Sequence, residues 1–294
     1  MAPGAGADQA ERVPLGEPLN RIREWVRRGP VIIVLLLMAF LTACQGVDVV
    51  EFAPLSGRYS ALVVNADTGN EIHAENADSP RFPASLTKMM TLYMLFEAIE
   101  QGRIARDGTI PVSANAARRP PSKLGVRAGG QLPVDTAIRA LAVKSANDVA
   151  AAVGEFIAGS ESRFAELMTA RAQSLGLTRT RFRNASGLPD EGQVTTARDM
   201  ARLGILLRRR FPQYFHYFDL KEFSYNGRTI RGHNRLLGDP GVDGIKTGYI
   251  RASGFNIVTS VTRGGKRFIV VVMGGDSGRE RDTRVRQLIA AYAK

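Results

Sequence analysis

The stretch SLTKMMTLYMLFEAIE, residues 85–100, has the length of an α-helix and carries apolar side chains on nearly every side. A helix that is apolar around most of its circumference is buried in a protein interior. We therefore expect a central helix over residues 85–100, ended by Gly102, with the remaining elements packed around it. Its apolar positions are Leu86, Met89, Met90, Leu92, Tyr93, Leu95, Phe96 and Ile99.

Strand patterns lie near both ends of the chain. Short runs with apolar and polar residues in alternation, bounded by Gly and Asn turns, are typical of strands and hairpins. The two later hairpins turn at Asn226–Gly227 and at Gly264–Gly265. The predicted strands are residues 59–65 and 71–74, 221–225 and 228–231, and 255–262 and 267–273.

Helical patterns fill the middle of the chain, over residues 133–143, 146–158, 161–175 and 195–208, and a last helix covers residues 279–293. Strands at both ends with helices between them favour an α+β fold. We expect an antiparallel sheet formed by the N- and C-terminal segments, covered by helices, with a mostly helical subdomain on one side.

Composition excludes several classes of protein. Of the 294 residues, 44% are hydrophobic and 23% are charged, which is ordinary globular usage. The single cysteine, Cys44, excludes an internal disulfide framework, and His73, His216 and His233 show no metal-ligand spacing. We expect no metal and no cofactor. The net charge of +12 comes without any nucleic-acid motif and suits an anionic cell envelope instead.

The first 44 residues are predicted to form an export signal. Four arginines between residues 21 and 28 precede the uncharged apolar run Val31–Leu41 and the small residues up to Cys44. Leu41–Cys44 resembles a bacterial lipobox, in which Cys44 is lipidated; ordinary cleavage and an uncleaved anchor are the alternatives. Residues 45–57 are expected to be a tether and residues 58–294 a catalytic domain, located outside the cytoplasm.

Ser85 and Lys88 begin the central helix and are three residues apart. That spacing places two side chains on one helix face, with about 5–6 Å between their Cβ atoms. A serine hydroxyl is a weak nucleophile until a neighbouring base removes its proton. A buried lysine can serve as that base, whereas an arginine cannot, and only seven of the forty basic residues are lysines.

Two later motifs supply further candidates. Ser145–Ala146–Asn147 stands at a loop–helix junction, where a hydroxyl and a carboxamide can both face a cleft. The same letters occur at Ser113–Asn115, beside the stretch Arg118–Pro121, and we prefer Ser145. Lys246–Thr247–Gly248, followed by Tyr249, lies in a predicted strand and offers positive charge and a hydroxyl for a carboxylate-bearing substrate.

In this order the three motifs resemble those of the penicillin-recognising serine D,D-peptidases, and most closely the low-molecular-mass D-alanyl-D-alanine carboxypeptidase family. Ser145 follows Ser85 by 60 residues, and Lys246 follows Asn147 by 99. The resemblance covers roughly residues 55–294 and includes further stretches: Pro83–Ala84, Asn184–Leu188, Thr196–Asp199, Asn234–Leu237 and Asp243–Gly244.

The resemblance implies a role for each motif residue. Ser85 would form an acyl-enzyme on a peptidoglycan stem peptide or with a β-lactam, Lys88 would be its base, and Ser145 would relay a proton. Asn147 would bind the substrate backbone. The remaining implied roles fall on the third motif: Lys246 and Thr247 for the terminal carboxylate, Gly248 for clearance, and the N–H groups of Ser85 and Tyr249 for the oxyanion.

Several alternatives stay open. Many family members carry a second, β-rich domain and a C-terminal anchor; we expect neither after Lys294 and expect an N-terminal lipid or signal anchor to attach the protein to the membrane. D,D-endopeptidase and transpeptidase activity on cross-links therefore remain alternatives to carboxypeptidase activity. A β-lactamase is disfavoured, because no residue matches a deacylating glutamate, and a non-catalytic β-lactam sensor is disfavoured because all motif residues are intact.

Overall fold

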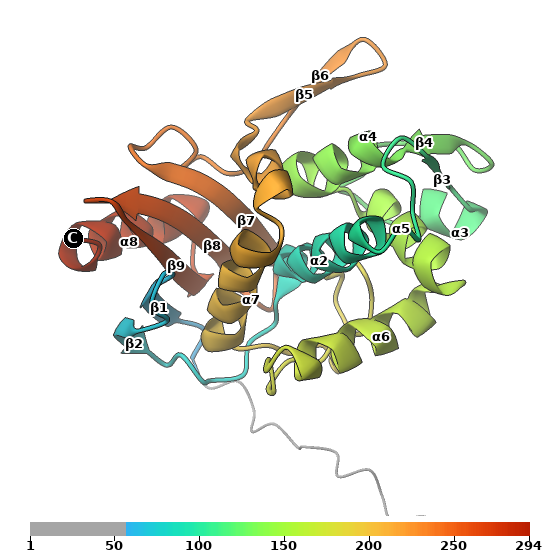
Figure 1. Cartoon of the computed structure of the whole chain (residues 1–294). Coiled ribbons are helices and arrows are strands. Elements are labelled where there is room, and N and C mark those ends of the chain that lie inside the picture. The colour runs from blue at the N-terminus through green and yellow to red at the C-terminus, as the bar shows by residue number, and fades with distance from the viewer. Residues whose placement is uncertain (1–56) are drawn as a thin grey trace, which may run out of the picture. The chain divides into compact units, whose positions relative to one another are not determined.

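The fold is built on a five-stranded antiparallel sheet with the strand order β2-β1-β9-β8-β7 (Figure 1). The computed structural model describes residues 57–294, so that the predicted export signal, Cys44 and nearly all of the tether lie outside the described residues. As expected, the first strand pairs with the last, with Ser60 opposite Met273. The strands are β1 (Ser60–Asn65), β2 (Glu71–Glu75), β7 (Val242–Ile250), β8 (Gly254–Arg263) and β9 (Lys266–Gly275).

Each strand of the sheet's centre contributes alternate side chains to two separate cores. In β1, Ala61 and Val63 belong to the cluster under helix α8 (Gly278–Tyr292), whereas Leu62 and Val64 belong to the larger cluster on the opposite face. β9 alternates in the same way. This period of two is what a strand dictates, and it places the sheet between α8 on one side and the remaining helices on the other (Figure 1).

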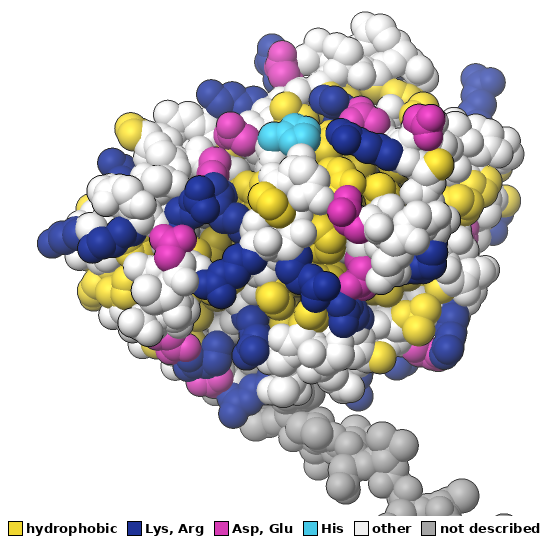
Figure 2. Space-filling model, viewed as in Figure 1, with side chains coloured by type: hydrophobic (Ala, Val, Ile, Leu, Met, Phe, Trp, Pro, Cys, Tyr) yellow, Lys and Arg dark blue, Asp and Glu magenta, His cyan; other side chains and the backbone are white. Residues whose placement is uncertain are grey.

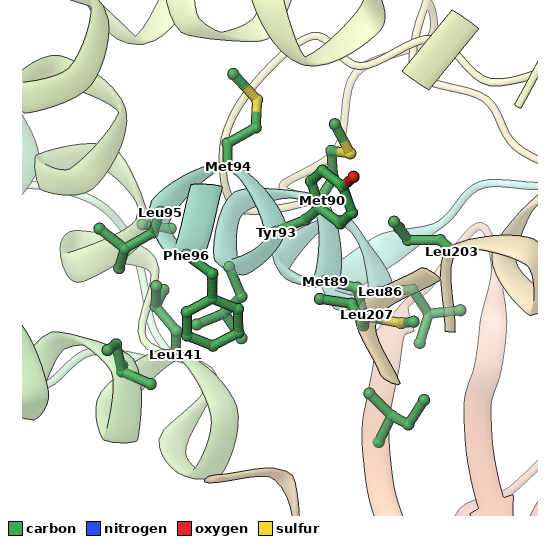
Figure 3. Packing of buried hydrophobic residues seen from close by; sticks show 14 of the residues in the cluster. Leu86, Met89, Met90, Tyr93, Met94, Leu95, Phe96, Leu141, Leu203 and Leu207 are labelled. Carbon is green, nitrogen blue, oxygen red and sulfur yellow. The ribbon is translucent and has the colours of Figure 1, made fainter. Parts of the chain in front are cut away.

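The central helix lies within the larger core. Helix α2 covers Thr87–Glu100, and the 3-10 turn η1 (Ala84–Leu86) precedes it. The side chains of α2 point to all sides of the helix (Figure 3), and Leu203 and Leu207 of α7 (Ala197–Arg210) belong to the same core as Met89, Tyr93 and Phe96. The expectation that Ser85 lies in the first turn of the α-helix is wrong in detail, because Ser85 is the middle residue of the 3-10 turn.

A mostly helical subdomain flanks α2, as predicted. The helix expected over residues 133–143 is α-helical in its first part, α4, and π-helical in its second part, η2. The π-helical turn, which is wider than an α-helical one, ends directly before Ser145. The sequence patterns gave no sign of the small ribbon β3–β4, of α3 or of the 3-10 segment η3. The remaining elements are β3 (Thr109–Pro111), α3 (Ala114–Ala117), β4 (Gln131–Pro133), α4 (Val134–Arg139), η2 (Ala140–Lys144), α5 (Asn147–Ala158), α6 (Glu161–Ser174), η3 (Pro212–Asp219), β5 (Glu222–Tyr225) and β6 (Arg228–Arg231).

Charged side chains cover much of the surface seen in Figure 2, where Lys and Arg stand among fewer Asp and Glu. Most arginines are exposed, so the positive charge is carried by the surface. Within residues 57–294, no helix has both the length and the apolar character needed to cross a membrane.

Candidate active site

Ser85 and Lys88 are in contact at the start of α2. The 3-10 turn and the first α-helical turn bring the Lys88 Nζ within 3.2 Å of the Ser85 Oγ. Lys88 is fully buried, while Ser85 is partly exposed and lines a cleft. The nucleophile candidate is therefore accessible from outside, and the amine behind it is not.

Lys88 has two further hydrogen-bond acceptors, the Asn147 Oδ1 at 2.7 Å and the Ser186 carbonyl oxygen at 2.5 Å. Burial and the nearby charge of Lys246 hold the pKa of Lys88 well below its usual range, against the opposing charges of Glu161 and Asp148. A lysine in such a position spends time as the neutral amine, which is the form that can accept a proton.

Ser145 and Asn147 reach the same cleft from the junction of η2 and α5. Ser145 adopts a left-handed backbone conformation, with φ 60° and ψ 40°, which is uncommon for a serine. Among the residues that the structure describes, no partner is found for the buried Ser145 Oγ. A hydroxyl held without a partner beside a reactive pair is free to bond to a substrate atom.

Ser113 lies elsewhere. It is the N-cap of the short helix α3, and its Oγ accepts the backbone N–H of Ala116 at 3.0 Å. It lines a different cavity from Ser85, whereas Ser145 and Asn147 line the cleft of Ser85. Of the two Ser-Ala-Asn stretches, the structure brings the preferred one to the Ser85–Lys88 pair.

Strand β7 forms the opposite wall of the cleft. A Cβ atom on Gly248 would lie 3.1 Å from the Ser85 nitrogen, a tight contact that a glycine avoids, so that the strand passes close to η1 without displacing it. Thr247 lines the cleft, and Tyr249 is half exposed and lies against Phe255, with 4.3 Å between the ring centroids. The third motif thus meets the first across a narrow gap.

Lys246 is buried behind this wall, and its Nζ donates to the Thr247 carbonyl oxygen at 3.0 Å. Burial, with the charge of Arg281 in second place, lowers the pKa of Lys246 to about 7. An anion bound nearby would favour the charged form of this lysine.

The cleft has a volume of about 430 Å³ and unites segments that are far apart in the sequence. It holds no group of His, Cys, Asp and Glu residues that fits a metal ion, and none occurs elsewhere in residues 57–294. The lining residues are Ser85, Pro121, Ser122, Ser145, Asn147, Gly187, Leu188, His233, Arg235, Thr247, Gly248, Tyr249, Ile250, Phe255, Gly278, Arg281 and Asp282.

Three features of the site were not predicted. The Ser186 carbonyl was missed because a backbone acceptor leaves no mark on residue type, although Asn184–Leu188 was noted as part of the resemblance. Arg281 was missed because it lies in the last helix without a motif around it; it is buried and pairs with Asp282. His233, of which the sequence showed only the lack of metal-ligand spacing, is exposed and lines the cleft.

An antiparallel sheet with a buried helix, a serine and a buried lysine in contact, and a Lys-Thr-Gly strand across the cleft together define a serine hydrolase of the penicillin-binding, D,D-peptidase class. A family model described as D-alanyl-D-alanine carboxypeptidase matches residues 54–277. The chain belongs to the D-alanyl-D-alanine carboxypeptidase family.

Individual relatives agree with this assignment. The D-alanyl-D-alanine carboxypeptidase DacA of Escherichia coli K12 is 34% identical over 267 residues, which cover 86% of this chain and 66% of the relative. Penicillin-binding protein 5 of Haemophilus influenzae has a solved structure with a TM-score of 0.76 and 33% identity, covering 81% of this chain and 71% of that one.

Penicillin-binding protein D2 of Listeria monocytogenes, solved in its ampicillin-bound form, has a TM-score of 0.74 and 28% identity, covering 82% of this chain and 99% of that one. The chain spans about two thirds of the length of the Escherichia coli relative.

Proposed function

We propose that the protein is a serine-type D-alanyl-D-alanine carboxypeptidase that removes the terminal D-Ala from peptidoglycan stem peptides. The observation that carries this proposal is the 3.2 Å contact between the Lys88 Nζ and the Ser85 Oγ, at the floor of a cleft that also holds Ser145, Asn147 and Thr247. A nucleophile within hydrogen-bond reach of its base is the geometry that acyl transfer requires.

Acylation follows from this geometry. The neutral Lys88 amine accepts the Ser85 proton while the Oγ attacks the carbonyl carbon of the penultimate D-Ala. The backbone N–H groups of Ser85 and Tyr249 bind the oxyanion, and each such donor is worth about 3–4 kcal/mol in a comparable acyl transfer. Ser145 relays the proton taken up by Lys88 to the departing nitrogen, so that the C–N bond breaks, D-Ala leaves as an amine, an ester forms on Ser85 and Lys88 is neutral again.

Substrate orientation depends on the charged end of the cleft. The substrate ends in a carboxylate, and Thr247, Lys246 and Arg281 place a hydroxyl and two positive charges near it. Charge-assisted hydrogen bonds of this kind are stronger than neutral ones. The Asn147 side chain is then available to hold the substrate backbone once its contact with Lys88 is released. Water finally hydrolyses the ester and regenerates the Ser85 hydroxyl.

Release of D-Ala from a diacyl-D-Ala-D-Ala peptide tests the proposal directly. We expect hydrolysis by the wild type, none by Ser85→Ala, and a covalent penicillin adduct that peptide mapping places on Ser85. Cleavage of cross-linked dimers alone would favour an endopeptidase, and transfer to an added amine a transpeptidase. Rapid turnover of penicillin would favour a β-lactamase, and a stable adduct without peptide hydrolysis a sensor.

We also propose that the protein is exported and attached to the cell envelope through its N-terminus, by a lipid on Cys44. The support is the order of a basic segment, the apolar run Val31–Leu41 and the lipobox-like residues up to Cys44. Cys44→Ser should leave the precursor uncleaved by the lipoprotein peptidase. Unchanged processing on a gel would point to ordinary signal cleavage instead.

A further inference from the structure

Lys88 is held between two loops. On one side, the Asn147 Oδ1 accepts from the Lys88 Nζ at 2.7 Å, and the Asn147 Nδ2 donates to the Pro120 carbonyl oxygen at 3.0 Å. Pro120 directly follows Arg119. The position of the Asn147 side chain, and through it one contact of Lys88, therefore depends on where the loop around Arg119 lies.

The second loop presents a carbonyl oxygen. Ser186 accepts from the Lys88 Nζ at 2.5 Å, and the preceding residue, Ala185, is fixed from both of its backbone ends. The Ala185 N–H donates to the Glu161 Oε1 at 3.1 Å, and the Thr91 Oγ1 donates to the Ala185 carbonyl oxygen at 2.6 Å. Glu161 thus holds the segment that carries the Ser186 carbonyl.

An ion pair between Arg119 and Glu161 joins the two loops. Glu161 is the first residue of α6. Its side chain is only 7% exposed, and the side chain of its basic partner, Arg119, is 30% exposed. A carboxylate this deeply buried is costly unless it is paired. The contacts close a ring that runs from Lys88 through Asn147 and Arg119 to Glu161, and back through Ser186.

We propose that Glu161 is a positioning residue for Lys88, acting through the Ala185–Ser186 backbone and through its negative charge, and that Arg119 completes the clamp. This inference rests on the proposed function, in which Lys88 is the base for Ser85. Neither Glu161 nor Arg119 lines the Ser85 cleft, so their influence reaches the reaction through Lys88.

The charges that face Lys88 come from three elements. Lys246 of β7 disfavours the charged form of Lys88, whereas Glu161 of α6 and Asp148 of α5 favour it. Asp148 does not contact the Ala185–Ser186 segment; it accepts the N–H groups of Leu124 and Gly125, which follow Arg119 and Pro120 in the same loop. Glu161 is therefore the one of these two carboxylates that also fixes the carbonyl in contact with Lys88.

The pH profile of acylation by a fluorescent penicillin tests the proposal in two variants. Glu161→Gln keeps the side-chain length but removes the charge, so that Lys88 loses its proton more readily and the acid limb shifts to lower pH by about half a unit or more. Glu161→Asp keeps the charge but cannot reach Ala185 at the same distance. Its acid limb should stay in place while the plateau rate falls about tenfold.

Glu166→Gln is the matched control, because Glu166 lies on the same helix and, among the described residues, pairs with the exposed Arg163 alone. We expect a wild-type profile for it. A Glu161→Gln limb at the wild-type pH, or a Glu161→Asp plateau within twofold of the wild type, would overturn the positioning role. If circular dichroism shows that Glu161→Gln is unfolded, the plateau rate of Glu161→Asp alone decides whether Glu161 has the positioning role.

Two outcomes separate this inference from the proposed function. A wild type that is not acylated at Ser85 at any pH would overturn both. A wild type acylated at Ser85, with unmoved limbs in the variants, would overturn only the role of Glu161. The clamp also predicts that Arg119→Gln and Glu161→Asp lower the plateau rate no further together than the worse one does alone, because interacting residues are not additive.

Discussion

Gly187 packs so closely against Ala84 that a Cβ atom at residue 187 would overlap the Ala84 carbonyl oxygen. Ala84 precedes Ser85, and Gly187 follows the residue whose carbonyl accepts from Lys88. This backbone contact therefore sets the distance between the nucleophile turn and the loop behind the base.

Gly187→Ala should displace that turn. Gly187 has a φ of +84°, and an alanine there would add steric overlap, costing about 1–3 kcal/mol, to the roughly 1–2 kcal/mol cost of a left-handed residue. Gly69→Ala is the matched control, with the same φ and no atom within 4 Å of its Cβ. We expect Gly187→Ala to lose far more thermal stability and penicillin acylation than Gly69→Ala. Equal losses would contradict a role for the contact.

The two buried lysines should respond differently to arginine. Lys88→Arg supplies no base, since arginine keeps its proton, and acylation should fall by at least ~10²-fold. Lys246→Arg retains a positive charge for the carboxylate and should stay within roughly tenfold of the wild type, above Lys246→Ala. Second-order acylation rates of folded variants decide this. Equal loss in both arginine variants would mean that the roles are not divided in this way.

The two Ser-Ala-Asn stretches provide an internal comparison. Ser145→Ala removes the hydroxyl proposed to relay a proton, and peptide turnover should drop strongly. Ser113→Ala removes only the α3 N-cap, which costs about 0.5–2 kcal/mol of stability, and turnover should change less than tenfold, or about 1.4 kcal/mol in barrier. D-Ala release and thermal unfolding of both variants give the ranking, and the reverse order for turnover would assign the motif to Ser113.

Stability should rise with pH because of Lys246. Its pKa of about 7 in the folded protein lies below that of an unfolded lysine, about 10.4. Between these values the unfolded chain holds a proton that the folded protein has released, so that the free energy of unfolding increases with pH, by at most about 1.4 kcal/mol per unit. Lys246→Met should reduce this slope in denaturant titrations at several pH values. Parallel curves for the two proteins would show that Lys246 stays charged when folded.

The strands of the sheet and the motif residues of the site could be predicted from the sequence, because strands leave an alternating pattern and the motif residues are defined by their types and spacing. The alternation in residues 59–65 and 267–273 predicted two strands, and their pairing followed from the α+β arrangement. Ser85, Lys88, Ser145 and Lys246 stood in recognisable motifs.

Contacts made by the backbone or by residues without a motif were beyond reach of the sequence. The residue type of Ser186 gives no indication that its backbone carbonyl accepts a hydrogen bond from a lysine 98 positions away. The π-helical turn before Ser145 and the buried pair Arg281–Asp282 depend on tertiary packing, which overrides local preference. Glu161 reads in the sequence as an ordinary residue of a helix's first turn.

The pairing of β1 with β9 has a consequence for how the protein is made. β1 pairs at once with β2, but its other neighbour, β9, is synthesised about 200 residues later, and β7, which forms a wall of the cleft, is also synthesised late. Such long-range pairing is slow to form. A growing chain therefore has no finished active site until β7 and β9 have been synthesised.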